Sequence, residues 1–173
     1  NGYMGPHLVK VLEKSYQLRI TDVMPIESEH ETMVVDVADL NQVMEATGGM
    51  DAVINCSVLR HDRKLAFDVS TRGSYNTMRA AVDHKIQRVI QTGPWTATNG
   101  QMIFDLDFEL NPDSPPSPST EVYALTKSLG QEICKVFTEN YHSLYVQCYL
   151  FSIFVDYDDP REGCNSNEFQ LSW

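Results

Sequence analysis

The chain has 173 residues, of which 42% are hydrophobic and 10% aromatic, as in a folded domain and not a disordered one. Its formal net charge of −11 excludes a general binder of nucleic acids or anionic membranes, because both need a surplus of Lys and Arg. No stretch approaches the roughly 20 apolar residues that span a bilayer, and no signal peptide opens the chain, so no membrane partner is predicted.

The four cysteines, Cys56, Cys134, Cys148 and Cys164, have neither a CxxC pair nor the spacing of Cys/His metal ligands. Cys56 and Cys148 lie in apolar runs typical of buried strands, where a free thiol behaves as a small hydrophobic group. These features favour a reduced, cytoplasmic setting. The cluster ESEHE at residues 27–31 is interpreted as a solvated charged turn, and no metal site is predicted.

Helical and strand patterns alternate along the chain. In order, the predicted elements are a helix over residues 5–14, strands over 17–22 and 32–37, a helix over 39–47, a strand over 52–56, a helix over much of 64–84, a strand over 87–92, a helix over 121–141 and a strand over 145–155. Asp39 is expected to cap the second helix, and Gly48-Gly49 to end it. Residues 99–120 are interpreted as a loop bordering a site, and the tail from residue 156 as polar and loop-like. This alternation predicts an α/β fold with a doubly wound, Rossmann-type parallel sheet.

The opening residues Asn1-Gly2-Tyr3-Met4-Gly5 lead directly into the first helix. Gly2 and Gly5 have the spacing of the second and third glycines of a GxxGxxG loop, which lets a pyrophosphate approach the backbone. Asp22 ends the next strand, near the offset at which a carboxylate binds the adenosine ribose, and it would repel a 2′-phosphate. Either feature alone is as well explained by an ordinary turn or strand end. Together they predict dinucleotide binding, with NAD favoured over NADP.

The segment Tyr123-Ala124-Leu125-Thr126-Lys127 carries the most specific chemistry. On a helix, Tyr123 and Lys127 share one face. A free tyrosine has a pKa of about 10, and a nearby ammonium favours the phenolate. Lowering that pKa to neutrality requires about 4 kcal/mol, which closely placed cations in a poorly solvated cleft can supply. A solvated helix face is the alternative, but the segment follows a fifth strand within a Rossmann-like pattern.

The whole arrangement resembles the extended short-chain dehydrogenases/reductases, of the NAD-dependent epimerase/dehydratase family, from Gly2 to about Phe154. The similar segments are VVDVAD at 34–39, DAVINCSV at 51–58, FDVSTRGSYN at 67–76, with Ser70 where the family usually has Asn, and PPSP at 115–118 leading to YALTK at 123–127. The resemblance implies cofactor contacts at the loop glycines and the strand ends: Gly2, Tyr3, Met4, Gly5, Asp22, Asp36, Val37, Cys56, Ser57, Val58, Ser70, Thr92, Tyr123, Lys127 and Phe151.

By the same resemblance, Tyr123 is the general acid/base, and Lys127 orients the ribose and lowers the tyrosine pKa. The family also has a Ser or Thr after the fifth strand, but Pro94 stands at that position in this chain. Proline has no side-chain donor and cannot perform this role. Thr96 is the substitute candidate, and Thr92 the next.

The resemblance implies an NAD-dependent oxidoreductase, epimerase or dehydratase that acts on a secondary alcohol or ketone. A nucleotide-sugar is the leading substrate, and a simple ketone the next. Pro94 favours an alternative, a non-catalytic NAD(P)-binding sensor or structural subunit of the same fold. The family also implies a homodimer through the two long helices.

Residues 1–155 are expected to form the NAD-binding domain, incomplete at its N-terminus, and residues 156–173 to begin the substrate-binding region. In a sheet of order 3-2-1-4-5-6 the first strand is central, so we expect this strand to precede Asn1. Most of the substrate domain is expected to follow Trp173.

Overall fold

The computed structural model describes residues 2, 4–59, 61–98, 115–151, 153–155 and 170–172, with side chains up to residue 150. Its elements are α1 (Gly5–Leu12), β1 (Arg19–Asp22), β2 (Glu31–Val34), α2 (Leu40–Thr47), β3 (Ala52–Asn55), α3 (Arg63–Phe67), the π-helical turn η1 (Asp68–Arg72), α4 (Gly73–Asp83), β4 (Arg88–Pro94), the 3-10 turn η2 (Trp95–Ala97), α5 (Val122–Asn140), β5 (Tyr145–Phe151), β6 (Ile153–Val155) and β7 (Gln170–Ser172). No helix in these residues is both long enough and apolar enough to cross a membrane.

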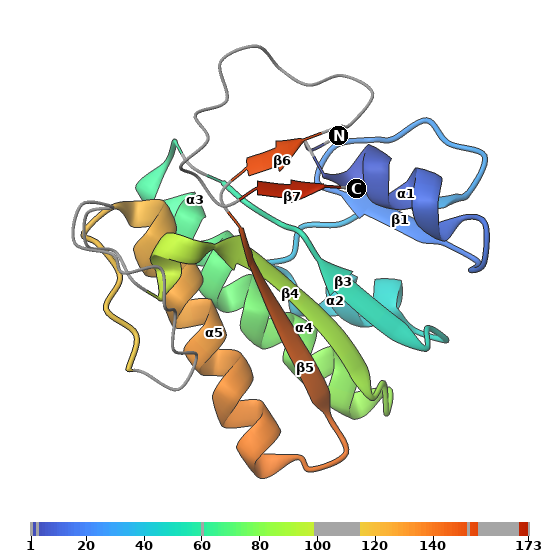
Figure 1. The fold of residues 1–173 in the computed structure, drawn as a ribbon. Helices are drawn as coiled ribbons and strands as arrows, with labels where there is room; N and C mark the ends of the chain where they lie inside the picture. Colours follow the sequence, from blue (N-terminus) through green and yellow to red (C-terminus); the bar gives the residue numbers. More distant parts are fainter. Residues whose placement is uncertain are drawn as a thin grey trace.

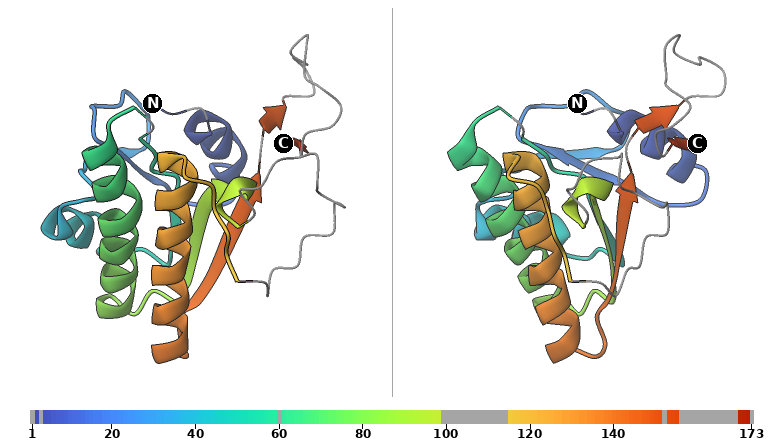
Figure 2. Two further views of the ribbon diagram at one scale, coloured as in Figure 1. Left: turned by 90° about the vertical axis from the view of Figure 1, so that its left-hand side faces the viewer. Right: turned by 60° about the vertical axis from the view of Figure 1, so that its left-hand side comes forward.

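All strand pairs among the described residues are parallel, which confirms the predicted α/β class (Figure 1). β1 pairs with β2, while β3, β4 and β5 form a second sheet in that order. The long helices α4 and α5 lie side by side against one face of this second sheet (Figure 2). Parallel strands need crossover connections, and α4 and α5 provide them between β3, β4 and β5.

The two sheets are not joined into one. Among the described residues, no strand pairs with the edge of β1 away from β2 or with the edge of β3 away from β4. The interruption falls where the doubly wound order 3-2-1-4-5-6 has its first strand.

The ends of α2 are as predicted. The carboxylate of Asp39 accepts hydrogen bonds from the backbone N–H groups of Asn41 and Gln42, which satisfies two of the donors left free at a helix start. Gly48 closes the helix, and Gly49 follows with a φ of 76°, a conformation that glycine adopts without strain.

The strand predicted over residues 145–155 is divided between two sheets, and every described residue in this range is in a strand. β5 ends at Phe151, opposite Pro94, which is the last residue of β4. The chain after Pro94 turns into η2, so β4 offers no further backbone partner, and β6 pairs instead with β7. β7 also corrects the prediction that the tail is only a loop. The helix predicted over residues 64–84 is interrupted by the π-turn η1.

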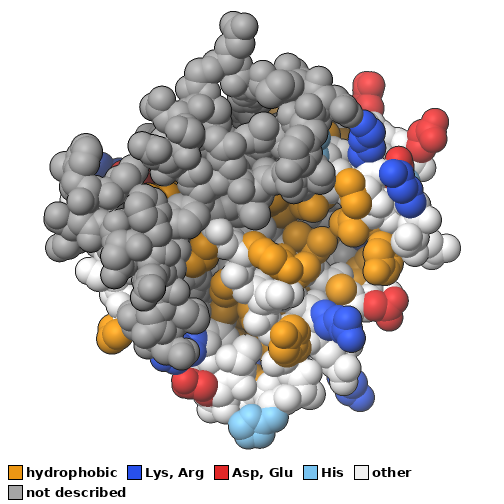
Figure 3. All heavy atoms as spheres, viewed as in Figure 1, with side chains coloured by type: hydrophobic (Ala, Val, Ile, Leu, Met, Phe, Trp, Pro, Cys, Tyr) orange, Lys and Arg blue, Asp and Glu red, His pale blue; other side chains and the backbone are white. Residues whose placement is uncertain are grey.

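Two clusters of buried apolar side chains form the core. One packs α4 and α5 against β4, with Met78, Val89, Cys134 and Phe137 among its members. The other joins the end of β2, α2 and α4, with Val43 and Ala80 at its centre. Hydrophobic side chains are also exposed in the middle of the face shown in Figure 3. Exposed large side chains on the strands include Ile54, Tyr145 and Tyr149.

Candidate functional site

The centre of the candidate site is the Lys127 ammonium, which lies at the carboxyl ends of β3 and β4. Its Nζ donates hydrogen bonds to the carbonyl oxygens of Ser57, at 2.7 Å, and of Thr92, at 2.9 Å. Ser57 follows the end of β3, and Thr92 lies near the end of β4. The Lys127 residue is only 2% exposed, so two backbone dipoles stabilise a charge that is withdrawn from water.

Tyr123 lies one turn before Lys127 in α5, which is α-helical from Val122 to Asn140. The helical geometry therefore places the two residues on one face, as the sequence predicts. Tyr123 is half-buried. Glu121 caps the helix, since its side chain accepts a hydrogen bond from the Ala124 N–H, and so fixes the start of the turn that carries Tyr123.

A buried polar network supports the acceptors of Lys127, and the sequence interpretation missed it. Asn55 Nδ2 donates to Gln91 Oε1 at 3.0 Å, and Gln91 Nε2 donates to Ser74 Oγ at 3.1 Å. The Ser57 N–H donates to Asn55 Oδ1 at 3.0 Å. The available signal was an amide side chain inside each of the apolar strand segments AVINC and RVIQT, where a polar group needs a buried partner.

The structure distinguishes the two candidates for the missing Ser. The Thr92 hydroxyl donates to the backbone carbonyl of Asn55 at 3.1 Å, so this group holds β4 against β3. Thr96 lies in the middle of η2, two positions after Pro94, and is half-buried. Thr96 therefore remains the better candidate for a hydroxyl that faces a ligand.

The loop after β3 carries the predicted contacts Cys56, Ser57 and Val58. Burial raises the pKa of the Cys56 thiol to about 11, although the Lys127 charge and a hydrogen bond with Thr92 act in the opposite direction. Cys56 is therefore a neutral thiol at physiological pH, beside the lysine. Cys56 and Ser57 are half-buried and Val58 is exposed. The prediction of buried strand cysteines holds only in part, because Cys148 lies in β5 but is exposed, and Cys56 is half-buried but follows β3.

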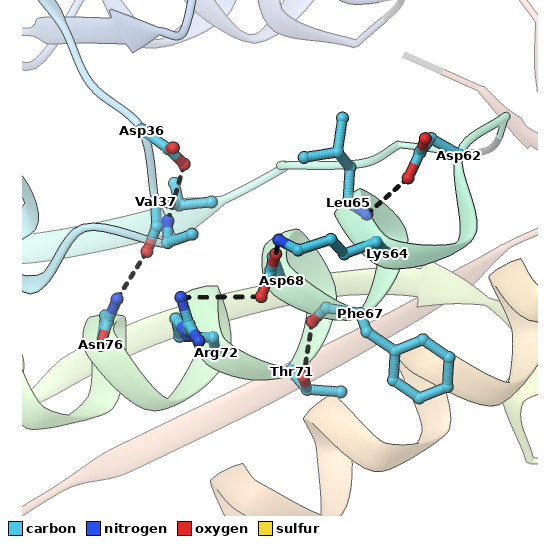
Figure 4. A network of polar contacts seen from close by, with 11 residues as sticks. Asp36, Val37, Asp62, Lys64, Leu65, Phe67, Asp68, Thr71, Arg72 and Asn76 are labelled. Carbon is cyan, nitrogen blue, oxygen red and sulfur yellow. Dashed lines mark hydrogen bonds and ion pairs between the residues drawn. The ribbon is translucent and has the colours of Figure 1, made fainter.

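Asp36 and Val37 form a corner after β2, packed on the start of α4 (Figure 4). The Asp36 carboxylate accepts a hydrogen bond from the Ala38 N–H at 2.9 Å, and Asn76 Nδ2 donates to the Val37 carbonyl at 2.8 Å. Gly73 allows this close approach, because a Cβ there would lie 2.8 Å from Val37 Cγ2. The conformation of the predicted adenine-contact residues is thus fixed by α4.

A hollow of about 510 Å³ lies beside this corner and contains one of the predicted cofactor residues, Asp36. Its lining residues come from the loop before α2, from α2 and from the α3–η1 segment: Asp36, Ala38, Asp39, Leu40, Lys64, Leu65, Asp68, Val69 and Arg72. Lys64 Nζ donates to Asp68 at 2.5 Å, and this hydrogen bond holds the pKa of the Asp68 carboxyl below its usual value (Figure 4).

Asp22 ends β1, as predicted. Its Oδ1 accepts a hydrogen bond from the Met24 N–H at 3.0 Å. Partial burial raises the pKa of Asp22, but hydrogen bonds, including the one from Met24, outweigh this effect and leave it below its usual value. Gly2 and Gly5 have open space where a Cβ would lie. Tyr3 and the Phe151 side chain lie outside the described part of the structure.

Ser70 carries a hydroxyl that none of the described residues satisfies. The residue is in η1 and 0% exposed, and its Oγ has no hydrogen-bond partner there. A buried polar atom without a partner costs free energy, so such groups often mark a place where a ligand or a water binds. Gly130 of α5 packs against this turn, and a Cβ on Gly130 would lie 2.6 Å from the Ser70 carbonyl oxygen.

Parallel strands joined by crossover helices define a Rossmann-type fold, in which ligands bind at the carboxyl ends of the strands. The chain belongs to the NAD-dependent epimerase/dehydratase family, whose sequence model matches residues 1–165. Among curated proteins, short-chain dehydrogenase/reductase family 42E member 1 of Danio rerio is 30% identical over 142 residues. That alignment covers 75% of this chain and 36% of the relative.

Solved structures share the fold. Uronate dehydrogenase from Agrobacterium tumefaciens superposes with a TM-score of 0.79 at 21% identity, covering 99% of this chain and 64% of the other. UDP-glucose 4-epimerase from Thermus thermophilus, in complex with NAD, has a TM-score of 0.76 at 18% identity, with 90% and 53% covered. The chain thus spans about a third of the curated relative and between half and two thirds of these two structures.

Proposed function

We propose that this protein is an NAD-dependent enzyme that acts on a secondary alcohol or ketone of a nucleotide-sugar, with Tyr123 as general acid/base. One observation carries the proposal: Lys127, one turn after Tyr123, holds its ammonium at the carboxyl ends of β3 and β4. In open α/β sheets, ligands bind at the carboxyl ends of the strands.

The residues present fit a dinucleotide. Asp22 has a carboxylate at the end of β1, suited to ribose hydroxyls and unfavourable for a 2′-phosphate, which favours NAD over NADP. Ser70 offers a buried hydroxyl that still lacks a partner in the described structure. Asp36 and Val37 form a fixed corner that we assign to adenine. The Thermus thermophilus epimerase was solved with NAD bound, which is consistent with this choice.

When bound, NAD supplies the carbon that accepts or donates a hydride. In this proposal, Tyr123 takes the hydroxyl proton as the alcohol becomes a ketone and returns it in the reverse direction. Lys127 stabilises the phenolate by its charge, because an ammonium one helical turn away favours the ionised form. The hydroxyl of Thr96 donates to the substrate oxygen, in place of the side chain that Pro94 lacks.

The substrate class is supported by the proteins that share this fold. One of them, MoeE5, superposes with a TM-score of 0.72 and was solved in complex with UDP-glucuronic acid and NAD. The Thermus thermophilus protein is itself a UDP-glucose 4-epimerase. We therefore propose a nucleotide-sugar in preference to a simple ketone.

Pro94 favours one alternative, a cofactor-binding protein without catalysis. It is buried and ends β4, at the position where a catalytic hydroxyl is expected. The paired Tyr123 and Lys127 oppose this alternative, since cofactor binding alone does not require a tyrosine base.

Fluorescence titration with NADH, followed by turnover assays on UDP-sugars, tests the proposal. Tyr123→Phe should leave NADH affinity within about threefold but reduce turnover by at least about 100-fold, the usual contribution of a general acid/base. Tyr145→Phe, an exposed tyrosine on β5, is the matched control and should leave both unchanged. Binding without turnover, unaffected by Tyr123→Phe, would establish the non-catalytic alternative.

A homodimer through α4 and α5 is part of the proposal. Tyr75 on α4 and Leu129 and Val136 on α5 are 47%, 40% and 55% exposed, which leaves apolar area for a partner helix pair. We also propose a cytoplasmic location, residues 1–155 as the NAD-binding domain, and residues 156–173 as the start of the substrate region.

A further inference from the structure

Two thiols meet where α5 packs on β5. Cys134 is on α5, 2% exposed, within the core cluster that includes Phe137. Cys148 is in the middle of β5, and its residue is exposed. Val146 packs against the cluster that contains Cys134. Side chains two apart in a strand share a face, so Cys148 is on the face of β5 that α5 covers.

The contact is consistent with the crossing of the two elements. A Cβ added to Gly93 of β4 would contact the side chains of Leu150 from β5 and Lys127 from α5. Leu150 and Lys127 therefore lie at the same height along the strand direction. The crossover helix runs antiparallel to its strands. Cys134, two turns after Lys127, therefore lies level with residues that precede Leu150, among them Cys148.

The two thiols differ in acidity. The hydrogen bond between them lowers the pKa of Cys148; partial burial acts in the opposite direction, and the Lys127 charge adds to the lowering. The same hydrogen bond, together with burial, raises the pKa of Cys134. The accessible thiol therefore ionises first, and the buried one stays protonated. This division suits a pair in which one sulfur reacts with an oxidant and the other closes a disulfide.

We propose that Cys134 and Cys148 are a reversible oxidation site, at which a peroxide converts the two thiols into a disulfide between α5 and β5. The inference does not depend on the proposed NAD chemistry, because every residue it needs lies in the contact between this helix and this strand.

The reaction balances in two steps. The Cys148 thiolate attacks a peroxide oxygen; an S–O bond forms, the O–O bond breaks, and the hydroxide that leaves takes up the proton released by Cys148. Cys134 sulfur then attacks the sulfenic sulfur; an S–S bond forms, the S–O bond breaks, and the leaving hydroxide takes the Cys134 proton. Two thiols and one hydrogen peroxide give one disulfide and two waters. A dithiol reductant reverses the change.

The disulfide would link α5, the helix that carries Tyr123 and Lys127, covalently to the strand β5. It would close a short loop containing the end of α5 and the turn before β5. Restricting a loop of this size in the unfolded chain should raise the melting temperature by roughly 5–10 °C.

Peptide mapping tests the proposal directly. Trypsin cleavage leaves Cys134 in the peptide 128–135 and Cys148 in the peptide 136–161, so the disulfide would join two separate peptides. The chain is treated with hydrogen peroxide, free thiols are alkylated, and the digest is analysed without reduction. A Cys56→Ser/Cys164→Ser variant removes the other two thiols and serves as background.

We expect the linked pair after oxidation, its loss with dithiothreitol, and a higher melting temperature of the oxidised form. In Cys134→Ser, dimedone should label Cys148 as the trapped sulfenic acid. The proposal is overturned if the folded chain, with an unchanged melting curve, yields no linked pair at peroxide concentrations that oxidise Cys148. It is equally overturned if Cys148 forms disulfides only between two chains.

Discussion

The ammonium of Lys127 and the carbonyl oxygen of Ser57 lie 2.7 Å apart, although 70 positions separate them in the chain. Ser57 is held from its other side as well, because its N–H donates to the side chain of Asn55. Asn55 thus positions an acceptor of the lysine, while Gln91 positions Asn55. The placement of Lys127 therefore depends on two buried amides from two different strands.

Removing the lysine should weaken the fold at this point. Lys127→Met leaves the Ser57 and Thr92 carbonyls without their donor, and we expect the free energy of unfolding to fall by about 1–3 kcal/mol. Lys135→Met, on the same helix but exposed, should change it by less than about 0.5 kcal/mol. Urea unfolding followed by circular dichroism gives both values. Equal effects of the two substitutions would show that the hydrogen bonds of Lys127 do not stabilise the fold.

The buried amides make a second prediction. Gln91→Leu leaves Asn55 Nδ2 without its acceptor in the core, so the free energy of unfolding should fall by about 1–3 kcal/mol. Gln147→Leu, an exposed glutamine on β5, is the control and should have little effect. Because the two amides act as a pair, Asn55→Ala combined with Gln91→Leu should cost less than the sum of the single changes. Additive effects would contradict the network.

Local signals explain what the sequence could predict. Asp39 and Gly48 determine the ends of α2 through groups a few residues away, and the four-residue spacing of Tyr123 and Lys127 fixes a shared face in any α-helix. These features depend only on residues that are close in the sequence, so they can be predicted from it.

The errors came from long-range structure. Residues 145–155 have one continuous strand pattern, which does not show that β5 pairs with β4 only as far as Pro94 and that β6 pairs with β7. The exposure of Cys148 follows from its place on an edge strand, which its apolar neighbours do not reveal. The network of Asn55 and Gln91 could be suspected from polar residues in apolar strands, but their partners are set by the sheet register.

Ser70 gives a prediction in which stability and binding change in different ways. Ser70→Ala removes a buried hydroxyl that has no partner in the described structure, so the free energy of unfolding should stay equal or rise. If that hydroxyl contacts the cofactor, NADH affinity should fall roughly 3–10-fold, the effect of one hydrogen bond. Ser74→Ala is the control, because the Ser74 hydroxyl donates to the Ser70 carbonyl and its loss should destabilise the fold. Unchanged NADH affinity in Ser70→Ala would remove Ser70 from the site.

Gly130 should resist the substitution that usually strengthens a helix. Alanine at a helical glycine stabilises by roughly 1 kcal/mol, but a Cβ at Gly130 would lie 2.6 Å from the Ser70 carbonyl oxygen and 2.8 Å from Ser74 Oγ. Because the first contact is with backbone, α5 must move away from η1, and Gly130→Ala should destabilise by about 1–3 kcal/mol. Gly5→Ala, with no atom within 4 Å of its Cβ, should not destabilise. Thermal melting curves of the two variants compare them directly.

Cys56 should be slow to react with alkylating reagents because burial raises its pKa to about 11. Only the thiolate reacts, so at pH 8 the rate with iodoacetamide should be roughly 100-fold below that of the unfolded chain, and it should rise as the pH approaches 11. Since the folded state holds this proton more tightly, the stabilisation from Cys56 is complete below pH 9 and is lost as the pH rises through 11.

Lys127 lowers the pKa of Cys56 by its charge, so Lys127→Met should slow the alkylation further. A chain in which Cys134, Cys148 and Cys164 are replaced by Ser isolates the signal, and faster alkylation in Lys127→Met would show that the charge does not act on this thiol.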